Sequence, residues 1–175
     1  LGLADPERRG HFVERVCAYA RCRSLLLGRN AAVRPAEFHA RHELAAMFHA
    51  RHELAVMAHG EAPARRLREQ AERARGQSAT KAYAAAFMAL IARKASRRGH
   101  ARVLQRAASL LDPALEREDR AALAEAIAAY RAGELRRIVP LTLLRRQLSR
   151  HPHPRLVDQT YLNPSPAELA LWCAL

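Results

Sequence analysis

The chain has few of the residues that build sheets or disulfide frameworks. Aromatic residues make up 5% of its 175 residues, no tract is rich in glycine, and the β-branched residues are scattered. Much of the apolar half is alanine, and this composition favours helices over strands. The three cysteines are an odd number and lack the spacing of a small disulfide framework, so we expect a reducing compartment.

No hydrophobic run is long enough to cross a bilayer. The longest, Tyr83 to Ala92, is much shorter than the roughly 20 residues that a spanning helix needs. No charged and then apolar leader precedes a cleavage site near residue 1. We therefore expect a cytoplasmic protein with no membrane partner.

The common sequence signatures of catalysis are also missing. There is no paired-carboxylate, nucleophile or phosphate-loop motif, and HExxH is absent because Ala46 and Val56 stand three residues after Glu43 and Glu53. These absences lean against an enzyme. The alternative that stays open is a histidine-based or metal-dependent enzyme, in which His49 or His59 acts as general base or histidines hold a metal that activates water.

Positive charge is abundant. Thirty basic residues face 17 acidic ones, giving a net charge of +13, and every basic residue except Lys81 and Lys94 is arginine. A surface of this kind attracts polyanions, and the planar arginine fork suits phosphate and stacking on bases. The alternative explanation is a GC-rich genome that replaces lysine with arginine while the charge stays spread over solvated faces.

Proline and glycine divide the sequence into helical lengths without a convincing alternating strand. The pattern predicts an all-α fold, a single domain over residues 1–175 built as a bundle of seven to eight helices with no sheet. The expected helices run from Pro6 to Gly28, Pro35 to His59, Ala62 to Arg75, a Ser78 cap to Ile91, a break at Gly99-His100 to Leu111, Glu116 to Ala132, and Val139 to the His151–Pro154 segment, with a short helix at Pro166–Cys173.

Residues 38 to 57 contain one ten-residue phrase twice, FHARHELAAM and then FHARHELAVM. The second copy runs into Ala58 and His59, so five of the nine histidines lie within 21 residues: His39, His42, His49, His52 and His59. On a helical wheel the imidazoles share one side, and the other side carries the expected core residues Leu44, Met47, Phe48, Leu54 and Met57.

Three readings of the histidine side remain open. It can hydrogen-bond along a cleft to phosphate or base edges, form an ordinary polar face, or, as a weaker alternative, hold a metal through His49 and His52. A ten-residue shift rotates the second copy by about 80° on an ideal helix, so both copies cannot present the same face. We interpret the duplication as a tolerated replication slip.

Several separated motifs resemble the YbgA-type bacterial domain of unknown function. The resemblance covers nearly the whole chain and rests on Phe48–His52 with Met57, Ala58 and His59 (FHARHKxxxMAH), His100–Gln105 (HTNVLQ), Tyr130–Gly133 (YRxG), Ile138–Leu144 (IVPLTLL) and Tyr161–Pro164 with Pro166, Glu168 and Leu169 (YLNPxPxEL). The chain departs from the pattern at Glu53, where the family has lysine, and at Arg102, where it has asparagine. Ala64 and Arg68 replace a tyrosine and a glycine.

The resemblance implies a domain without an established reaction. The family occurs alone or as the C-terminal half of proteins whose N-terminal half is an iron–sulfur domain resembling thiouracil desulfidases. Because residue 1 is leucine, we expect the chain to be the C-terminal part of a longer product. We expect no cofactor in this domain and an iron–sulfur cluster in the missing N-terminal domain.

We therefore expect an accessory helical domain that binds a nucleotide or RNA and supports desulfuration of thiolated pyrimidine nucleotides by a fused or partner iron–sulfur domain. A structural protein-interaction domain is the third possibility. Imidazole and guanidinium groups from separate helices are expected to meet in one pocket for an anionic guest. The candidate ligand-binding residues are His49, Arg51, His52, His59, Arg65, His100, Arg102 and Gln105. The candidate phosphate-steering residues are Arg145, Arg146, Arg150 and Arg155.

Overall fold

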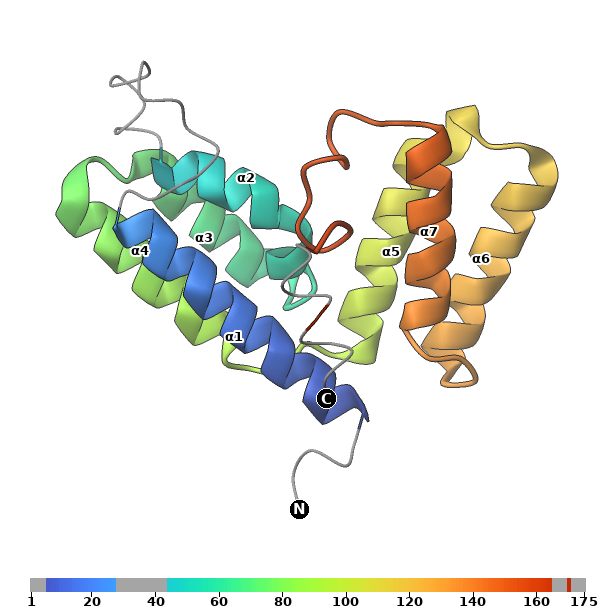
Figure 1. Ribbon diagram of the computed structural model, residues 1–175, viewed down its shortest axis with the longest axis horizontal. Coiled ribbons are helices and arrows are strands. Elements are labelled where there is room, and N and C mark those ends of the chain that lie inside the picture. Colours follow the sequence, from blue (N-terminus) through green and yellow to red (C-terminus); the bar gives the residue numbers. More distant parts are fainter. Residues whose placement is uncertain (1–5, 28–43, 165–169, 171–175) are drawn as a thin grey trace.

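A computed structural model of the chain describes residues 6–27, 44–164 and 170. These residues form seven α-helices and one short 3-10 helix, with no strand among them, so the all-α prediction is confirmed. The elements are α1 (Pro6–Leu26), α2 (Leu44–Met57), α3 (Glu61–Arg73), α4 (Gly76–Ile91), α5 (Arg97–Leu111), η2 (Asp112–Ala114), α6 (Arg117–Ala132) and α7 (Ile138–Arg150). Helices α1 to α4 form one group and α5 to α7 another (Figure 1).

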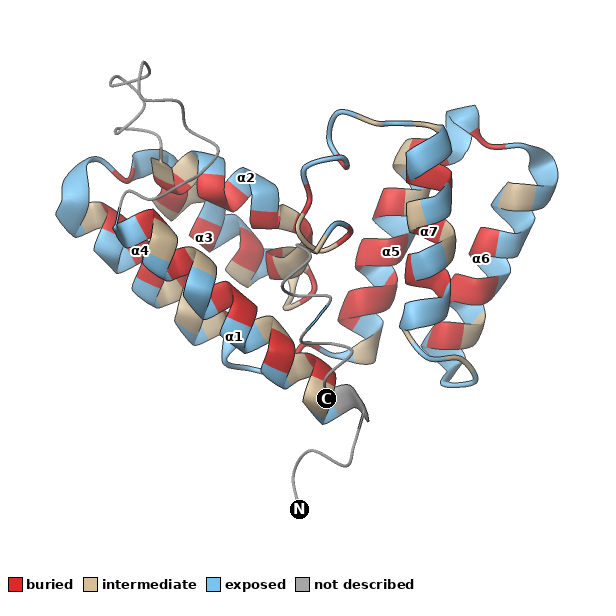
Figure 2. Ribbon diagram, in the orientation of Figure 1, coloured by how far each residue is buried: buried red, intermediate tan, exposed pale blue. Residues whose placement is uncertain are grey.

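The helices belong to two hydrophobic cores. The first joins α1 to α4 around Tyr83 and Phe87, and the second joins α5 to α7 around Leu104 and Leu144. Helix α2 connects them, because its Val56 lies in the first core and its Leu54 in the second. Figure 2 shows buried positions along α5, α6 and α7, which supply most of the second core.

The predicted ends of α6 are confirmed, and the predicted start of α4 is wrong. Gly133 follows α6 in the left-handed conformation, with φ of 97°, which glycine adopts without steric cost. Helix α4 begins at Gly76 after Arg75, with no side-chain cap, so Ser78 lies inside the first turn instead of capping it.

The predicted break at Gly99-His100 is also wrong. Helix α5 begins at Arg97, and its cap is Ser96, whose hydroxyl accepts a hydrogen bond from the Gly99 amide at 3.0 Å. A Cβ atom added to Gly99 would lie 2.0 Å from the Ala58 carbonyl oxygen. The glycine therefore permits a close approach of α5 to the end of α2 and does not stop the helix.

The segment after α7 ties the two groups of helices together (Figure 1). The Gln159 side chain is buried, donates to the Ala50 carbonyl at 2.8 Å and accepts from the Leu54 amide at 3.1 Å. These two backbone groups would bond to each other in a regular helix. The Thr160 amide also donates to the Arg51 carbonyl, at 2.9 Å, so this segment is anchored along one side of α2.

The expected separation of imidazoles from core on the histidine helix is wrong for the second copy of the phrase. His49 and His52 are both 4% exposed, whereas Met47, an expected core residue, is 40% exposed. The reason is aromatic packing, since the His52 ring stacks on Phe48 at 4.0 Å between centroids. Residues 35–43 of the helix expected from Pro35, most of the first copy with His39 and His42, and most of the last expected helix lie outside the described residues.

Candidate ligand-binding cavity

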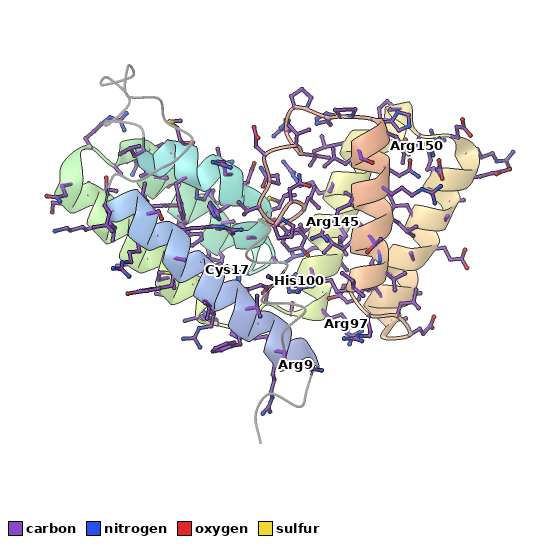
Figure 3. The ribbon with its side chains drawn as sticks, viewed as in Figure 1. Arg9, Cys17, Arg97, His100, Arg145 and Arg150 are labelled. Carbon is purple, nitrogen blue, oxygen red and sulfur yellow. The ribbon has the colours of Figure 1, made fainter. Side chains whose placement is uncertain are left out.

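A cavity of about 740 Å³ lies where the two groups of helices meet. It is bounded by α1, the end of α2, the start of α5, the start of α7 and the Thr160–Pro164 segment. Figure 3 labels Cys17, His100 and Arg145 in this region, whereas Arg150 lies at the far end of α7. Volumes of this size are typical of pockets for small molecules and cofactors.

The lining of the cavity is rich in positive charge. Its cationic side chains come from α1, the α4–α5 connection, α5, the α6–α7 connection and α7, and they outnumber the lining carboxylates, which belong to Glu14 and Glu134. The cations are Arg21, Lys94, Arg97, Arg136, Arg137 and Arg145. Because low-dielectric walls strengthen the field in a cleft, such a lining favours an anionic guest.

A polar network crosses the cavity from α1 to the C-terminal segment. Arg137 Nη2 donates to Glu14 Oε1 at 2.5 Å, and Arg137 Nη1 lies 2.9 Å from His100 Nε2 and 3.1 Å from His100 Nδ1. The His100 Nδ1 atom is in turn 3.0 Å from the Tyr161 hydroxyl, and the two rings stack at 5.9 Å. The network therefore couples four elements that are distant in sequence.

The network fixes the protonation of its members. Burial first, and then the neighbouring Arg137 guanidinium, lower the pKa of His100 to about 2, so the imidazole is neutral. Arginine only donates, so we assign the lone pair to Nε2, the nitrogen nearest Arg137, and the proton to Nδ1, which donates to Tyr161. Burial raises the pKa of Tyr161, so its hydroxyl stays protonated.

His52 has a similar fixed tautomer at the other end of the cavity. Its Nδ1 donates to the Phe48 carbonyl at 2.7 Å, so Nε2 carries the lone pair and lies 3.5 Å from Arg21 Nη1. Burial lowers the pKa of His52 to about 3. A guanidinium beside the free nitrogen disfavours a metal cation there, and no three His, Cys, Asp or Glu residues within 6–27, 44–164 and 170 are placed to hold a metal.

His59 and Arg145 also line the cavity. Burial lowers the pKa of His59, and the Glu14 carboxylate opposes this change. Burial and then the Arg137 charge lower the pKa of Arg145, whose Nε donates to the Leu162 carbonyl. Four predicted site residues thus line one cavity: His52, His59, His100 and Arg145.

Other predicted ligand-binding residues lie elsewhere. His49 is buried against Tyr83, whose hydroxyl is 3.2 Å from His49 Nδ1, and it does not line the cavity. Burial lowers the pKa of His49. The remaining candidates are exposed and outside the cavity lining: Arg51, Arg65, Arg102 and Gln105.

The predicted phosphate-steering residues do not form one stripe. Arg145 faces the cavity, whereas Arg146 and Arg155 are exposed and outside its lining. Arg150 Nη1 lies 3.4 Å from Asp119 Oδ2 of α6. These arginines follow different faces of α7 and the segment after it, so only Arg145 is placed at the cavity.

Sequence reasoning missed the contribution of α1 and of the α6–α7 connection. His11, Glu14, Ala18 and Arg21 line the cavity at intervals of three and four residues, which is the spacing of one helix face. A helical wheel of the α1 sequence places these four residues on one face. Nothing local in the sequence marks Arg137, because its partners come from α1, α5 and the C-terminal segment.

The fold and cavity define an all-helical domain with a cation-lined cavity between two packed groups of helices. No helix among the described residues combines the length and apolar character needed to cross a membrane. Residues 54–166 match the family described as protein of unknown function DUF1722, and the chain belongs to this family. Searches of curated proteins and of solved structures found no significant match.

Proposed function

We propose that the chain is an accessory domain whose cavity binds a pyrimidine nucleotide through its phosphate. The cation-lined cavity between α1, α5 and α7 is the observation that supports this function. Arginine pairs with phosphate oxygens through two parallel hydrogen bonds, and Arg97, Arg136 and Arg145 lie at the same cavity. The volume of about 740 Å³ suits a mononucleotide better than a folded RNA.

The neutral histidines favour recognition over catalysis. A general base works best with a pKa near the operating pH. Burial holds the pKa of His52 at about 3 and that of His100 at about 2, far below neutrality. The His52 imidazole instead directs the lone pair of Nε2 toward the Arg21 side of the cavity, which suits accepting a hydrogen bond from a heterocycle.

The resemblance of the sequence to domains fused with desulfidase-like iron–sulfur domains supports a thiolated pyrimidine nucleotide as the guest. In this proposal the cavity retains the nucleotide and a fused or partner iron–sulfur domain performs the sulfur removal. The described residues of this chain supply binding groups, and the cluster belongs to the other domain.

Calorimetric titration with uridine 5′-monophosphate and its 4-thio analogue tests the proposal. Arg145→Gln should weaken binding by about tenfold or more, because a charge-assisted contact to phosphate is lost. Arg146→Gln is the matched control, since it removes the same charge from the next residue of α7 outside the cavity. Uridine without phosphate should bind much more weakly than the monophosphate.

Equal losses in the Arg145 and Arg146 variants would show that net charge, and not the cavity, attracts the nucleotide. No saturable binding of either monophosphate by the folded chain would overturn the proposal. Equal affinity for the 4-thio analogue and uridine monophosphate would leave nucleotide binding standing and would remove the preference for a thiolated base.

A further inference from the structure

A second cationic surface lies on the side of α5 that faces away from the cavity. Arg98, Arg102 and Arg106 are exposed, and Gln105 is exposed among them. At 100° per residue these four side chains fall within about 100° of arc, and the arginines span about 12 Å along the axis. We name these four residues the α5 strip. Arg97 and His100, which line the cavity, lie on the opposite side of the helix.

The α5 strip is unfavourable for the fold. Arg98, Arg102 and Arg106 follow one another at intervals of four residues, where like charges repel on a helix surface. Helix α5 has no acidic residue. Within the described ranges, none of the three arginines has a hydrogen bond or an ion pair.

Three exposed arginines on other elements are compensated by a carboxylate. Arg68 pairs with Glu72 one turn along α3, Arg120 with Asp112, and Arg150 with Asp119. An uncompensated cationic row in a helix whose opposite face is well buried is a local conflict between sequence and fold, which is typical of a functional surface.

We propose that the α5 strip binds the phosphate backbone of single-stranded RNA. Guanidinium forks pair with phosphates, and the Gln105 amide between them has donors and acceptors suited to base edges. The strip has no aromatic or large apolar side chain of the kind that forms the centre of a protein–protein interface. This surface is separate from the nucleotide cavity and extends the function from a single nucleotide to a chain.

Fluorescence anisotropy of a short labelled single-stranded RNA, measured over a range of salt concentrations, tests the proposal. The triple variant Arg98→Gln, Arg102→Gln, Arg106→Gln should bind at least about tenfold more weakly at low salt. Three lost phosphate contacts should also reduce the slope of log affinity against log salt by about 2, at roughly 0.7 per contact on a single strand. Glutamine has a helix propensity close to that of arginine, so the helix is retained.

The same variant should be slightly more stable than the parent. Removing two like-charge pairs should raise the midpoint of thermal unfolding by about 1 to 3 °C. A loss of RNA affinity together with a gain in stability separates a binding role from a structural one. A lower midpoint would mean that the arginines support the fold, and it would contradict the proposal.

The control removes three arginines from α3, as Arg66→Gln, Arg68→Gln, Arg73→Gln, where acidic residues are interspersed. An equal loss of RNA affinity in this control would overturn the proposal in favour of net charge alone. Polyglutamate that binds the parent as tightly as RNA would overturn it in favour of an acidic protein partner. Arg145→Gln should leave RNA binding intact, so failure of the nucleotide cavity and failure of the α5 strip are distinguishable.

Discussion

Replacing Gly99 with alanine tests the close contact between α5 and α2. In an unconstrained helix this substitution stabilises by about 1 kcal/mol, because alanine has the higher helix propensity. Here the new Cβ would lie 2.0 Å from the Ala58 carbonyl oxygen, and the nearest obstacle is backbone that no rotamer change can move. Separating the two helices costs about 3 kcal/mol, toward the upper end of overpacking penalties. The net expectation is a loss of about 2 kcal/mol.

Urea unfolding monitored by circular dichroism measures this loss of free energy. In thermal unfolding, the melting midpoint should fall by about 4 to 8 °C for a chain of this size. Gly76→Ala is the control for backbone strain without a clash, since Gly76 has φ of +75° and no atom within 4 Å of the added Cβ. It should cost about 1 kcal/mol. An increase in stability for Gly99→Ala would refute the packing of α5 against the end of α2.

Three further outcomes are expected. The pKa values of His52 and His100 are about 3 and 2 in the folded chain and about 6.5 in the unfolded chain, so the unfolded chain binds more protons below about pH 6.5. The free energy of unfolding should therefore fall by about 2 kcal/mol per histidine between neutral pH and about pH 5. His52→Gln should reduce this dependence in urea titrations, and an unchanged dependence in this variant would contradict the burial of a neutral His52. Gln159→Ala removes two hydrogen bonds to α2 and should cost about 2 kcal/mol of stability, with faster proteolysis after α7; an unchanged cleavage rate would contradict the anchoring. Burial raises the pKa of the Cys22 thiol to about 12, so a thiol reagent at mildly alkaline pH should modify it only after unfolding, and rapid labelling of the native chain at Cys22 would be evidence against that burial.

Local signals were sufficient for most of the fold. Gly133 and the His151–Pro154 segment end α6 and α7 as predicted, because backbone conformation at glycine and proline is determined within a few residues. Gly99 shows the limit of such reasoning. Because Gly99 has no side chain, its backbone can approach the Ala58 carbonyl oxygen, 41 positions earlier in the sequence. The residues next to Gly99 do not indicate this contact.

The candidate site was predictable only where residue type was decisive. His59 and His100 were expected in one pocket and both line the cavity, which Arg145, expected on a phosphate-steering stripe, lines as well. His49 was expected with them, but its ring instead packs against the Tyr83 ring and lies within hydrogen-bond distance of the Tyr83 hydroxyl. A neutral imidazole is an aromatic ring and can pack in a core when its nitrogen has a partner. The pairing of Glu14 with Arg137 could not be predicted, because the two residues are 123 positions apart in the sequence.

The claim that the cavity is the nucleotide site is tested most directly by recording histidine ring resonances in NMR spectra during a titration with uridine 5′-monophosphate. The ring signals of His59 and His100 should shift in a saturable manner while those of His49 stay unchanged, since His59 and His100 line the cavity and His49 does not. Saturable binding that leaves His59 and His100 unshifted, or that shifts His49 instead, would contradict it.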